Sequence, residues 1–280
     1  MGIEIQGLSY WYDTGVCALK DISLTIQPGE CVALLGHNGS GKTTLVKHFN
    51  GLLHPSQGVV LINGIPTTER RVAQLAGVVA LLFQNPDDQI CKRTVWDETA
   101  YGPKNLGYAN ERVREQVNAS LSAFDLLTMK ERNPHDLSYS ERKRLAIASV
   151  LAMDTEIVVL DEPTAGLDPR EINLLKAAMR QLQSNGKSVV VISHDMDFIA
   201  ENMLRAVCLE NGRKCFDGGV ADLFEKHSFL EQCGLLPPQV VQLSSHFNLR
   251  LQTLTPKDFI ERLVDTIHGH RHGERRRQTP

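Results

Sequence analysis

The sequence lacks any apolar run of the roughly 20 residues that a membrane-spanning helix needs. Its longest apolar runs, such as "GVVALLF" and "EIVVL", have the length of a buried strand. The opening residues, "MGIEIQGLSY", lack the basic-then-apolar layout of a secretory signal. The formal net charge of −3 provides no overall field that would attract nucleic acid or an anionic membrane. We therefore expect a protein without membrane spans of its own, and we expect no nucleic-acid partner.

The cysteines also lack a familiar pattern, because no two of them form a C-x-x-C pair. Several lie within apolar, strand-like runs, so we interpret them as reduced, buried, small hydrophobic residues of a cytosolic protein. A zinc site or a disulfide framework is the alternative. The six are Cys17, Cys31, Cys91, Cys208, Cys215 and Cys233.

What the sequence does contain is an alternation of strand-like and helical patterns from about residue 30 to residue 205. The strand-like runs are rich in Val, Ile and Leu, which is typical of a largely parallel sheet buried on both faces. The predicted strands are 31–36, 59–63, 78–83, 157–161 and 189–193. The predicted helices are 42–52, 110–124, 140–153, 169–184 and 196–203. The first 28 residues and "AVCLENGRKCFD" predict antiparallel strands, the latter with a hairpin turn at Asn211–Gly212.

A glycine-rich segment, "GHNGSGKTT" (36–44), matches the pattern G-x-x-x-x-G-K-[ST] between a predicted strand and a predicted helix. Gly36, Gly39 and Gly41 let the backbone curl so that its N–H groups point at phosphate oxygens. Lys42 is predicted to reach the β- and γ-phosphates, and the Thr43 hydroxyl to coordinate Mg²⁺. The segment therefore predicts a site for the phosphates of a nucleotide and for Mg²⁺. The other nucleotide-binding candidates in this loop are Asn38, Ser40 and Thr44.

Two acidic residues end the strand-like run "EIVVLDE". Asp161 follows four apolar residues, where a carboxylate is costly to bury unless it faces solvent or a cation, so we expect it to hold hydrated Mg²⁺. Glu162 follows it and is predicted to orient and deprotonate an attacking water. The alternative for Glu162 is that it only caps the following turn.

The stretch "LSYSERKR" (137–144) has the composition of a helix start. Ser138 and Glu141 have the spacing of a capping box, in which each side chain accepts a hydrogen bond from the other residue's backbone N–H. A helix N-terminus also offers free N–H groups to an anion.

Taken in order, the segments "GHNGSGKT", "FQNPDDQ", "LSYSERKRLAIASVLAM", "VVLDEPTAGLDP" and "VISHD" resemble an ATP-binding cassette (ABC) ATPase. The resemblance spans residues 12–195. It implies an α/β fold: a P-loop NTPase core with an antiparallel β subdomain, an inserted helical subdomain and a small C-terminal extension. It also implies that ATP joins two subunits head-to-tail and that hydrolysis lets them part.

The resemblance assigns further residues to the nucleotide site. Tyr12 would stack on the adenine, with Trp11 as a substitute and a core strand tyrosine as the alternative. Gln84 would contact Mg²⁺ and the attacking water, Asp168 would lie at the dimer seam, and His194 would sense the γ-phosphate.

The same resemblance implies that the stretch beginning at Ser138 binds the γ-phosphate of ATP held by the opposite subunit. The family usually has LSGGQ here, so Ser140 and Glu141 depart from the pattern. Serine fits a right-handed helical position without strain, although its Cβ crowds the phosphate and Glu141 adds negative charge. We expect a working but slower site.

The segment 83–108 and the stretch "LSYSERKRLAIASVLAM" resemble the energy-coupling factor (ECF) type of importer, most of all its cobalt/nickel ATPases. This implies a subunit that couples ATP-driven dimer closure to uptake of a micronutrient, cobalt or nickel ion. Its partners would be a second ATPase subunit, with a homodimer favoured, and integral-membrane transmembrane and substrate-binding subunits at the cytoplasmic face of a prokaryotic cell membrane. The alternatives are a vitamin ECF importer, a non-transport cytosolic ABC ATPase, and a nucleotide-binding switch without turnover.

These patterns divide the chain into three regions. Residues 1–220 are predicted to form the nucleotide-binding domain, with the helical subdomain at about 86–155. Residues 221–267 are predicted to be a C-terminal extension that contributes to dimerisation. Residues 268–280 lack apolar periodicity and are predicted to be a disordered tail, in which His268, His270 and His272 either bind a metal ion weakly or have no role.

Overall fold

The computed structural model describes residues 2–246, 257, 259–261 and 263–264. The predicted tail 268–280 and its histidines lie outside the described residues, as does much of the second half of the predicted extension. None of the helices in the described part of the chain combines the length and the apolarity needed to cross a bilayer.

The core is a six-stranded sheet with the strand order β10-β9-β3-β8-β7-β6. Strands β9, β3, β8, β7 and β6 run parallel, and β10 pairs antiparallel with β9. All residues of β7 and β8 are buried, as the continuous apolar runs predicted. The strands are β3 (Cys31–Leu35), β6 (Val79–Leu82), β7 (Ile157–Asp161), β8 (Ser188–Ile192), β9 (Arg205–Glu210) and β10 (Arg213–Gly219).

A second, antiparallel sheet has the strand order β2-β1-β4-β5. Its strands are β1 (Ile3–Trp11), β2 (Cys17–Ile26), β4 (Gln57–Ile62) and β5 (Ile65–Pro66). The prediction that 59–63 belongs to the parallel sheet was therefore wrong. Only Val60 and Ile62 of β4 are fully buried, because the strand has one packed face and pairs antiparallel with β1.

Helix α1 (Lys42–Lys47) follows the glycine-rich loop and is shorter than the predicted 42–52. The chain continues as turns through Gly51, whose φ of 72° lies in the left-handed region and ends the helical path. A short helix, α2 (Val72–Leu75), follows β5. Single 3₁₀ turns lie at Thr67–Glu69, Pro86–Asp88, Leu127–Met129 and Pro134–Asp136.

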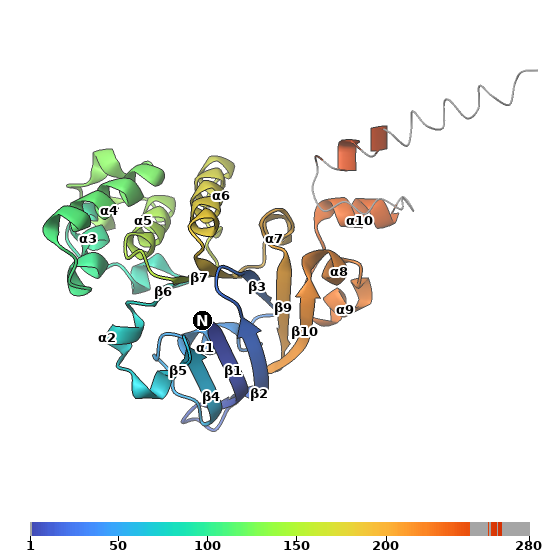
Figure 1. The fold of residues 1–280 in the computed structure, drawn as a ribbon. Helices are drawn as coiled ribbons and strands as arrows, with labels where there is room; N and C mark the ends of the chain where they lie inside the picture. Colours follow the sequence, from blue (N-terminus) through green and yellow to red (C-terminus); the bar gives the residue numbers. More distant parts are fainter. Residues whose placement is uncertain (1, 247–256, 258, 262, 265–280) are drawn as a thin grey trace, which may run out of the picture.

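Three helices lie between β6 and β7 and form a lobe at one side of the molecule (Figure 1). They are α3 (Val95–Asn105), α4 (Asn110–Ala123) and α5 (Tyr139–Leu151). The predicted helices 110–124 and 140–153 match α4 and α5 to within two residues at each end. The predictions 169–184 and 196–203 likewise match α6 (Pro169–Ser184) and α7 (Met196–Asn202). We call the region of α3–α5 the helical lobe.

The C-terminal helices lie on the opposite side from the helical lobe (Figure 1). They are α8 (Val220–Phe224), α9 (His227–Gln232) and α10 (Gln239–His246). The predicted hairpin between β9 and β10 is confirmed, with Asn211 and Gly212 at φ values of 50° and 78°. The prediction that all cysteines are buried was wrong for two of them, because Cys91 and Cys215 are exposed.

Candidate functional site

A pocket of about 470 Å³ opens where the carboxyl ends of β3, β7 and β8 meet. The carboxyl edge of an open parallel sheet is where such folds bind ligands. The lining residues are Tyr12, Val16, Cys17, Ala18, Asn38, Gly39, Gly41, Lys42, Thr43, Thr44, Gln84, Asp161, Glu162, Ile192 and His194. The structure therefore brings together most of the residues that the sequence analysis assigned to the nucleotide.

The glycine-rich loop can take its shape only with glycines at two of its positions. Gly36 has a φ of 142°, and a Cβ there would lie 2.2 Å from the Leu209 carbonyl oxygen. Gly41 has a φ of 105°, and a Cβ there would lie 2.8 Å from the Ala18 carbonyl oxygen. Beneath the loop, Ser40 is fully buried and its N–H donates to the His37 carbonyl at 3.1 Å. Gly36 and Ser40 therefore support the loop from behind rather than lining the pocket.

Lys42 begins α1 and curls back over the loop. Its Nζ donates to the carbonyl oxygens of Gly36 at 2.7 Å and His37 at 2.9 Å. Burial lowers the pKa of Lys42, while the carboxylates of Glu162 and Asp161 partly oppose that shift. The ammonium group is thus held at the loop centre, where it can interact with phosphate oxygens.

The predicted metal ligands Thr43 and Asp161 lie in direct contact. The Thr43 hydroxyl donates to Asp161 Oδ2 at 2.9 Å, and burial raises the pKa of Asp161. The pair offers the hard oxygen donors that Mg²⁺ prefers, and the buried carboxylate gains a counter-charge if a cation binds. The residues present therefore fit Mg²⁺.

Glu162 and His194 lie side by side in the pocket lining. The His194 N–H donates to Glu162 Oε2 at 3.3 Å, and His194 Nε2 lies 3.5 Å from Glu162 Oε1. Within the described part of the chain, no group forms a hydrogen bond with the buried Glu162 Oε1, and burial raises the pKa of this residue. The carboxylate is therefore directed at His194 rather than at the turn that follows, which disfavours the capping alternative. His194 Nε2 also lies 3.0 Å from Asn38 Oδ1, and burial lowers the pKa of His194.

Tyr12 lies at the rim of the pocket and is partly exposed. Its hydroxyl forms a 2.8 Å hydrogen bond with the Thr44 hydroxyl, and its ring meets that of Tyr10 edge-on at 5.0 Å. The residue is therefore not a core strand tyrosine, and it lines the pocket where the predicted adenine would lie.

Lys143 is a residue that the sequence analysis did not assign to the site. It lies on α5 and is completely buried, and its Nζ donates to the Gln84 carbonyl at 2.7 Å and lies 3.5 Å from the Asp161 carbonyl. Burial lowers its pKa to about 8. The Gln84 side chain lines the pocket, so one ammonium group links α5 to the chain beside Gln84 and to the end of β7. The sequence did not indicate that Lys143 is buried, because its neighbours in the stretch "SERKR" are polar.

The predicted capping box at the start of α5 is confirmed. The Ser138 N–H donates to Glu141 Oε2 at 2.7 Å, and the Glu141 N–H donates to Ser138 Oγ at 3.3 Å. The hydrogen bond from the Ser138 backbone lowers the pKa of Glu141, so its negative charge remains at this helix end. The N–H groups of Tyr139 and Ser140 lie in the first turn, where a helix supplies no partner.

Asp168 begins α6 and forms a second capping box with Glu171. Glu171 accepts from the Asp168 N–H at 2.9 Å through Oε2, while its Oε1 lies 3.0 Å from Arg144 Nε. Arg144 also donates to the Phe124 carbonyl at 2.5 Å. The start of α6 is thus connected to α5 and to the helical lobe. Ser138, Ser140, Glu141 and Asp168 are not among the residues that line the pocket.

Comparison with known proteins gives a family match. The ABC transporter family matches residues 19–165. A putative ABC transporter ATP-binding protein of Pyrococcus furiosus is 44% identical over 248 residues, which cover 89% of this chain and 94% of the relative. The energy-coupling factor transporter ATP-binding protein EcfA of Carboxydothermus hydrogenoformans is 40% identical, covering 90% of this chain and 93% of that protein.

The chain is also similar to solved structures with the same fold. The structure of cbiO1 from Clostridium perfringens, described as part of the ABC transporter complex cbiONQ, has a TM-score of 0.72 and 31% identity, covering 87% of this chain and 98% of that chain. The dimeric ATP-binding cassette MJ0796 bound to ADP and phosphate has a TM-score of 0.71 and 26% identity, covering 78% of this chain and 98% of that chain. With the P-loop fold and the pocket described above, these matches show that the chain belongs to the ABC transporter family as an ATP-binding subunit and is an ATPase.

Proposed function

We propose that this chain is the ATP-hydrolysing subunit of an ECF-type importer and that two copies close head-to-tail around two ATP molecules. The observation that carries the proposal is the division of the site. The pocket is lined by residues of the phosphate loop (the glycine-rich segment 36–44) and by Asp161, Glu162 and His194, whereas the α5 start at Ser138 lies outside it. We interpret the pocket and this helix start as two complementary halves that different copies bring together. The dimeric structure of MJ0796 supports a pair of ATPase subunits.

In the proposed mechanism, the loop amides and Lys42 hold the β- and γ-phosphates of ATP. Thr43, Asp161 and Gln84 would hold Mg²⁺, which neutralises phosphate charge when bound. Glu162 accepts a proton from water as the water oxygen attacks the γ-phosphorus, and the bond from that phosphorus to the bridging oxygen breaks to release ADP. The unpartnered Oε1 of Glu162 is the atom suited to take the proton. His194, held near both Glu162 and Asn38, would contact the γ-phosphate.

The first-turn amides of α5 in the partner copy would complete the γ-phosphate contacts, since a helix N-terminus favours an anion. Asp168 would lie at the seam between the copies. Because Glu141 remains charged at this helix end, we infer slower turnover than a glutamine would permit.

We propose membrane partners and a cargo on the basis of the resemblance to relatives. The resemblance to EcfA and to cbiO1 supports integral-membrane partners at the cytoplasmic face of a cell membrane and an imported micronutrient, for which we propose cobalt or nickel ion.

The test is capture of the tagged full chain from membranes of its source cells, followed by reconstitution of the complex in lipid vesicles. ATP-dependent accumulation of Co²⁺ or Ni²⁺, measured by elemental analysis and lost with Glu162→Gln, would support the proposal. If a vitamin accumulates instead of Co²⁺ or Ni²⁺, the proposed cargo is wrong and the complex is a vitamin importer. If the chain hydrolyses ATP at full rate but captures no membrane protein, the importer proposal is wrong and the chain is a cytosolic ATPase.

A further inference from the structure

Three side chains with metal-binding atoms meet on the side of the molecule away from the helical lobe. Glu210 ends β9, Cys215 lies in β10, and Cys233 follows α9. A carboxylate oxygen and the two Sγ atoms all lie within 4.8 Å of one another. Cys233 is buried and Cys215 is exposed, so the cluster has one closed side and one open side.

Local backbone features bring these residues together. The Asn211–Gly212 turn reverses the chain directly after Glu210. Cys215 lies in an irregularity of the β9–β10 pairing, between the pairs that Lys214 and Phe216 form with β9. Such a bulge turns a side chain away from its regular direction.

The third residue, Cys233, directly follows helix α9. Leu230 of this helix is fully buried, and the Phe229 ring packs 6.0 Å from the Phe216 ring of β10. These contacts hold Cys233 opposite Cys215.

The spacing of the two sulfur atoms suits a bridging cation. Cys215 Sγ and Cys233 Sγ are 4.0 Å apart. Two thiolates on one tetrahedral Zn²⁺, each at about 2.3 Å from the ion, are separated by about 3.8 Å. A disulfide instead requires about 2.05 Å and would need the two elements to move together.

We propose that Glu210, Cys215 and Cys233 bind one thiophilic divalent cation of the zinc type, with water as a fourth ligand. Each thiol gives up its proton to solvent as its sulfur binds the ion, and the carboxylate adds a third negative charge to the ligand set. Exposed Cys215 provides the entry path, while buried Cys233 anchors the ion to the fold.

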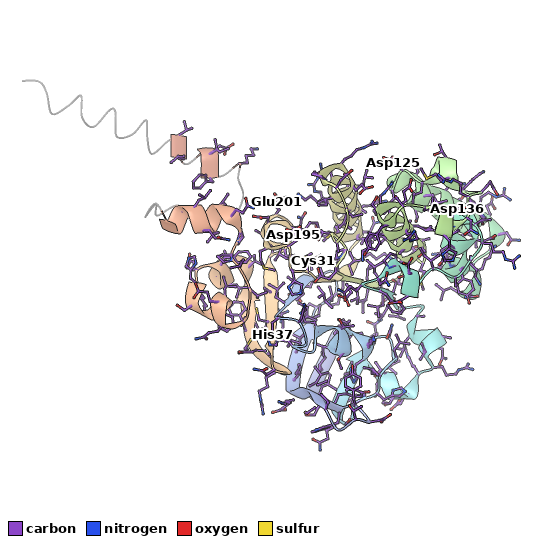
Figure 2. All side chains as sticks on the ribbon, turned by 180° about the vertical axis from the view of Figure 1, so that it is seen from behind. Cys31, His37, Asp125, Asp136, Asp195 and Glu201 are labelled. Carbon is purple, nitrogen blue, oxygen red and sulfur yellow. The ribbon has the colours of Figure 1, made fainter. Side chains whose placement is uncertain are left out.

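The proposed site is connected to the phosphate loop from two directions. The Gly212 N–H donates to the Ser40 carbonyl at 3.1 Å. Gly234 packs so closely on His37 that a Cβ there would lie 3.3 Å from the His37 Cβ. Figure 2 shows His37 where the strands of the core meet the C-terminal helices. A cation that joins β10 to α9 would therefore brace the loop from behind.

The test is a titration of the reduced full-length chain with Co²⁺, read by absorption, followed by Zn²⁺ as a competitor. We expect a thiolate-to-cobalt charge-transfer band in the near ultraviolet that disappears as Zn²⁺ displaces Co²⁺. Cys215→Ser should lower the intensity of this band by about half or more, because it removes one of the two thiolate ligands, and Glu210→Gln should weaken Co²⁺ binding by at least about tenfold. Cys91→Ser removes another exposed thiol and is the matched control, which should leave the band unchanged.

Two results would overturn the proposal. One is the absence of a thiolate band although Co²⁺ binds, which would assign binding to other groups such as the tail histidines. The other is a band that persists at full strength in Cys215→Ser. Because Cys215 is exposed, this variant should fold, and an unchanged far-ultraviolet circular dichroism spectrum verifies that it does.

Discussion

Replacing Glu171 with Gln should destabilise the chain by about 3 kcal/mol, because the change leaves the Arg144 guanidinium buried without its counter-charge. The two side chains are only 10% and 12% exposed, and Arg144 Nε lies 3.0 Å from Glu171 Oε1. Breaking such a pair from one side costs roughly 3–5 kcal/mol. The lower figure applies because Gln can still accept from the Asp168 N–H and Arg144 retains the Phe124 carbonyl.

The measurement is urea unfolding followed by circular dichroism. With a slope of about 3 kcal/mol/M for a chain of this size, the midpoint should fall by about 1 M. Adding Arg144→Met to Glu171→Gln should recover most of the loss, since the double variant no longer buries an unpaired charge.

A matched control lies beside this pair. Arg170 and Asp125 form an ion pair at 2.8 Å between the same two parts of the chain, but their side chains are 81% and 46% exposed. Figure 2 shows Asp125 on the helical lobe. Asp125→Asn should cost less than about 1 kcal/mol. If Glu171→Gln lowers the midpoint no more than Asp125→Asn, or if the double variant is less stable still, the assigned role of the buried pair is wrong.

Three further predictions concern turnover and nucleotide binding. Glu162→Gln should lower phosphate release by roughly 10²–10⁴-fold with ATP binding retained, and unchanged release would contradict its role as the base. Ser140→Gly should change steady-state ATP turnover: a rise would support crowding by the serine Cβ, and a fall would show that Ser140 is adapted to its position. Gly41→Ala should abolish ATP binding in calorimetry without unfolding the chain, because its φ of 105° and the nearby Ala18 carbonyl exclude a side chain; normal affinity would refute this steric argument.

Several parts of the fold could be predicted because each had its own local signal. Residues 157–161 and 189–193 are continuous apolar runs, and they form the fully buried strands β7 and β8. The Asn211–Gly212 dipeptide predicted the hairpin because both residues accept positive φ. The segment 59–63 misled because its apolar run resembles those strands, and only pairing with a distant partner, β1, assigns it to the antiparallel sheet.

The site shows the same division between local and distant information. The phosphate loop and Asp161 were predictable because ligand chemistry fixes residue types at close spacing. Lys143 was not, since its burial depends on carbonyl groups at Gln84 and Asp161, 59 and 18 residues away. The cluster of Glu210, Cys215 and Cys233 was equally hidden, because a bulge and a helix packing contact create it.

The buried position of Lys143 has a mechanical consequence. Its ammonium group connects α5 to the backbone of Gln84 and lies near the end of β7, so it is a fulcrum: a fixed point about which the helical lobe would rotate. Ser138 lies little more than one helical turn from this fulcrum, and each turn advances a helix by about 5.4 Å. If the helical lobe tilted, the start of α5 at Ser138 would therefore move by a short distance, and the Lys143 hydrogen bond would move the backbone of Gln84 with it.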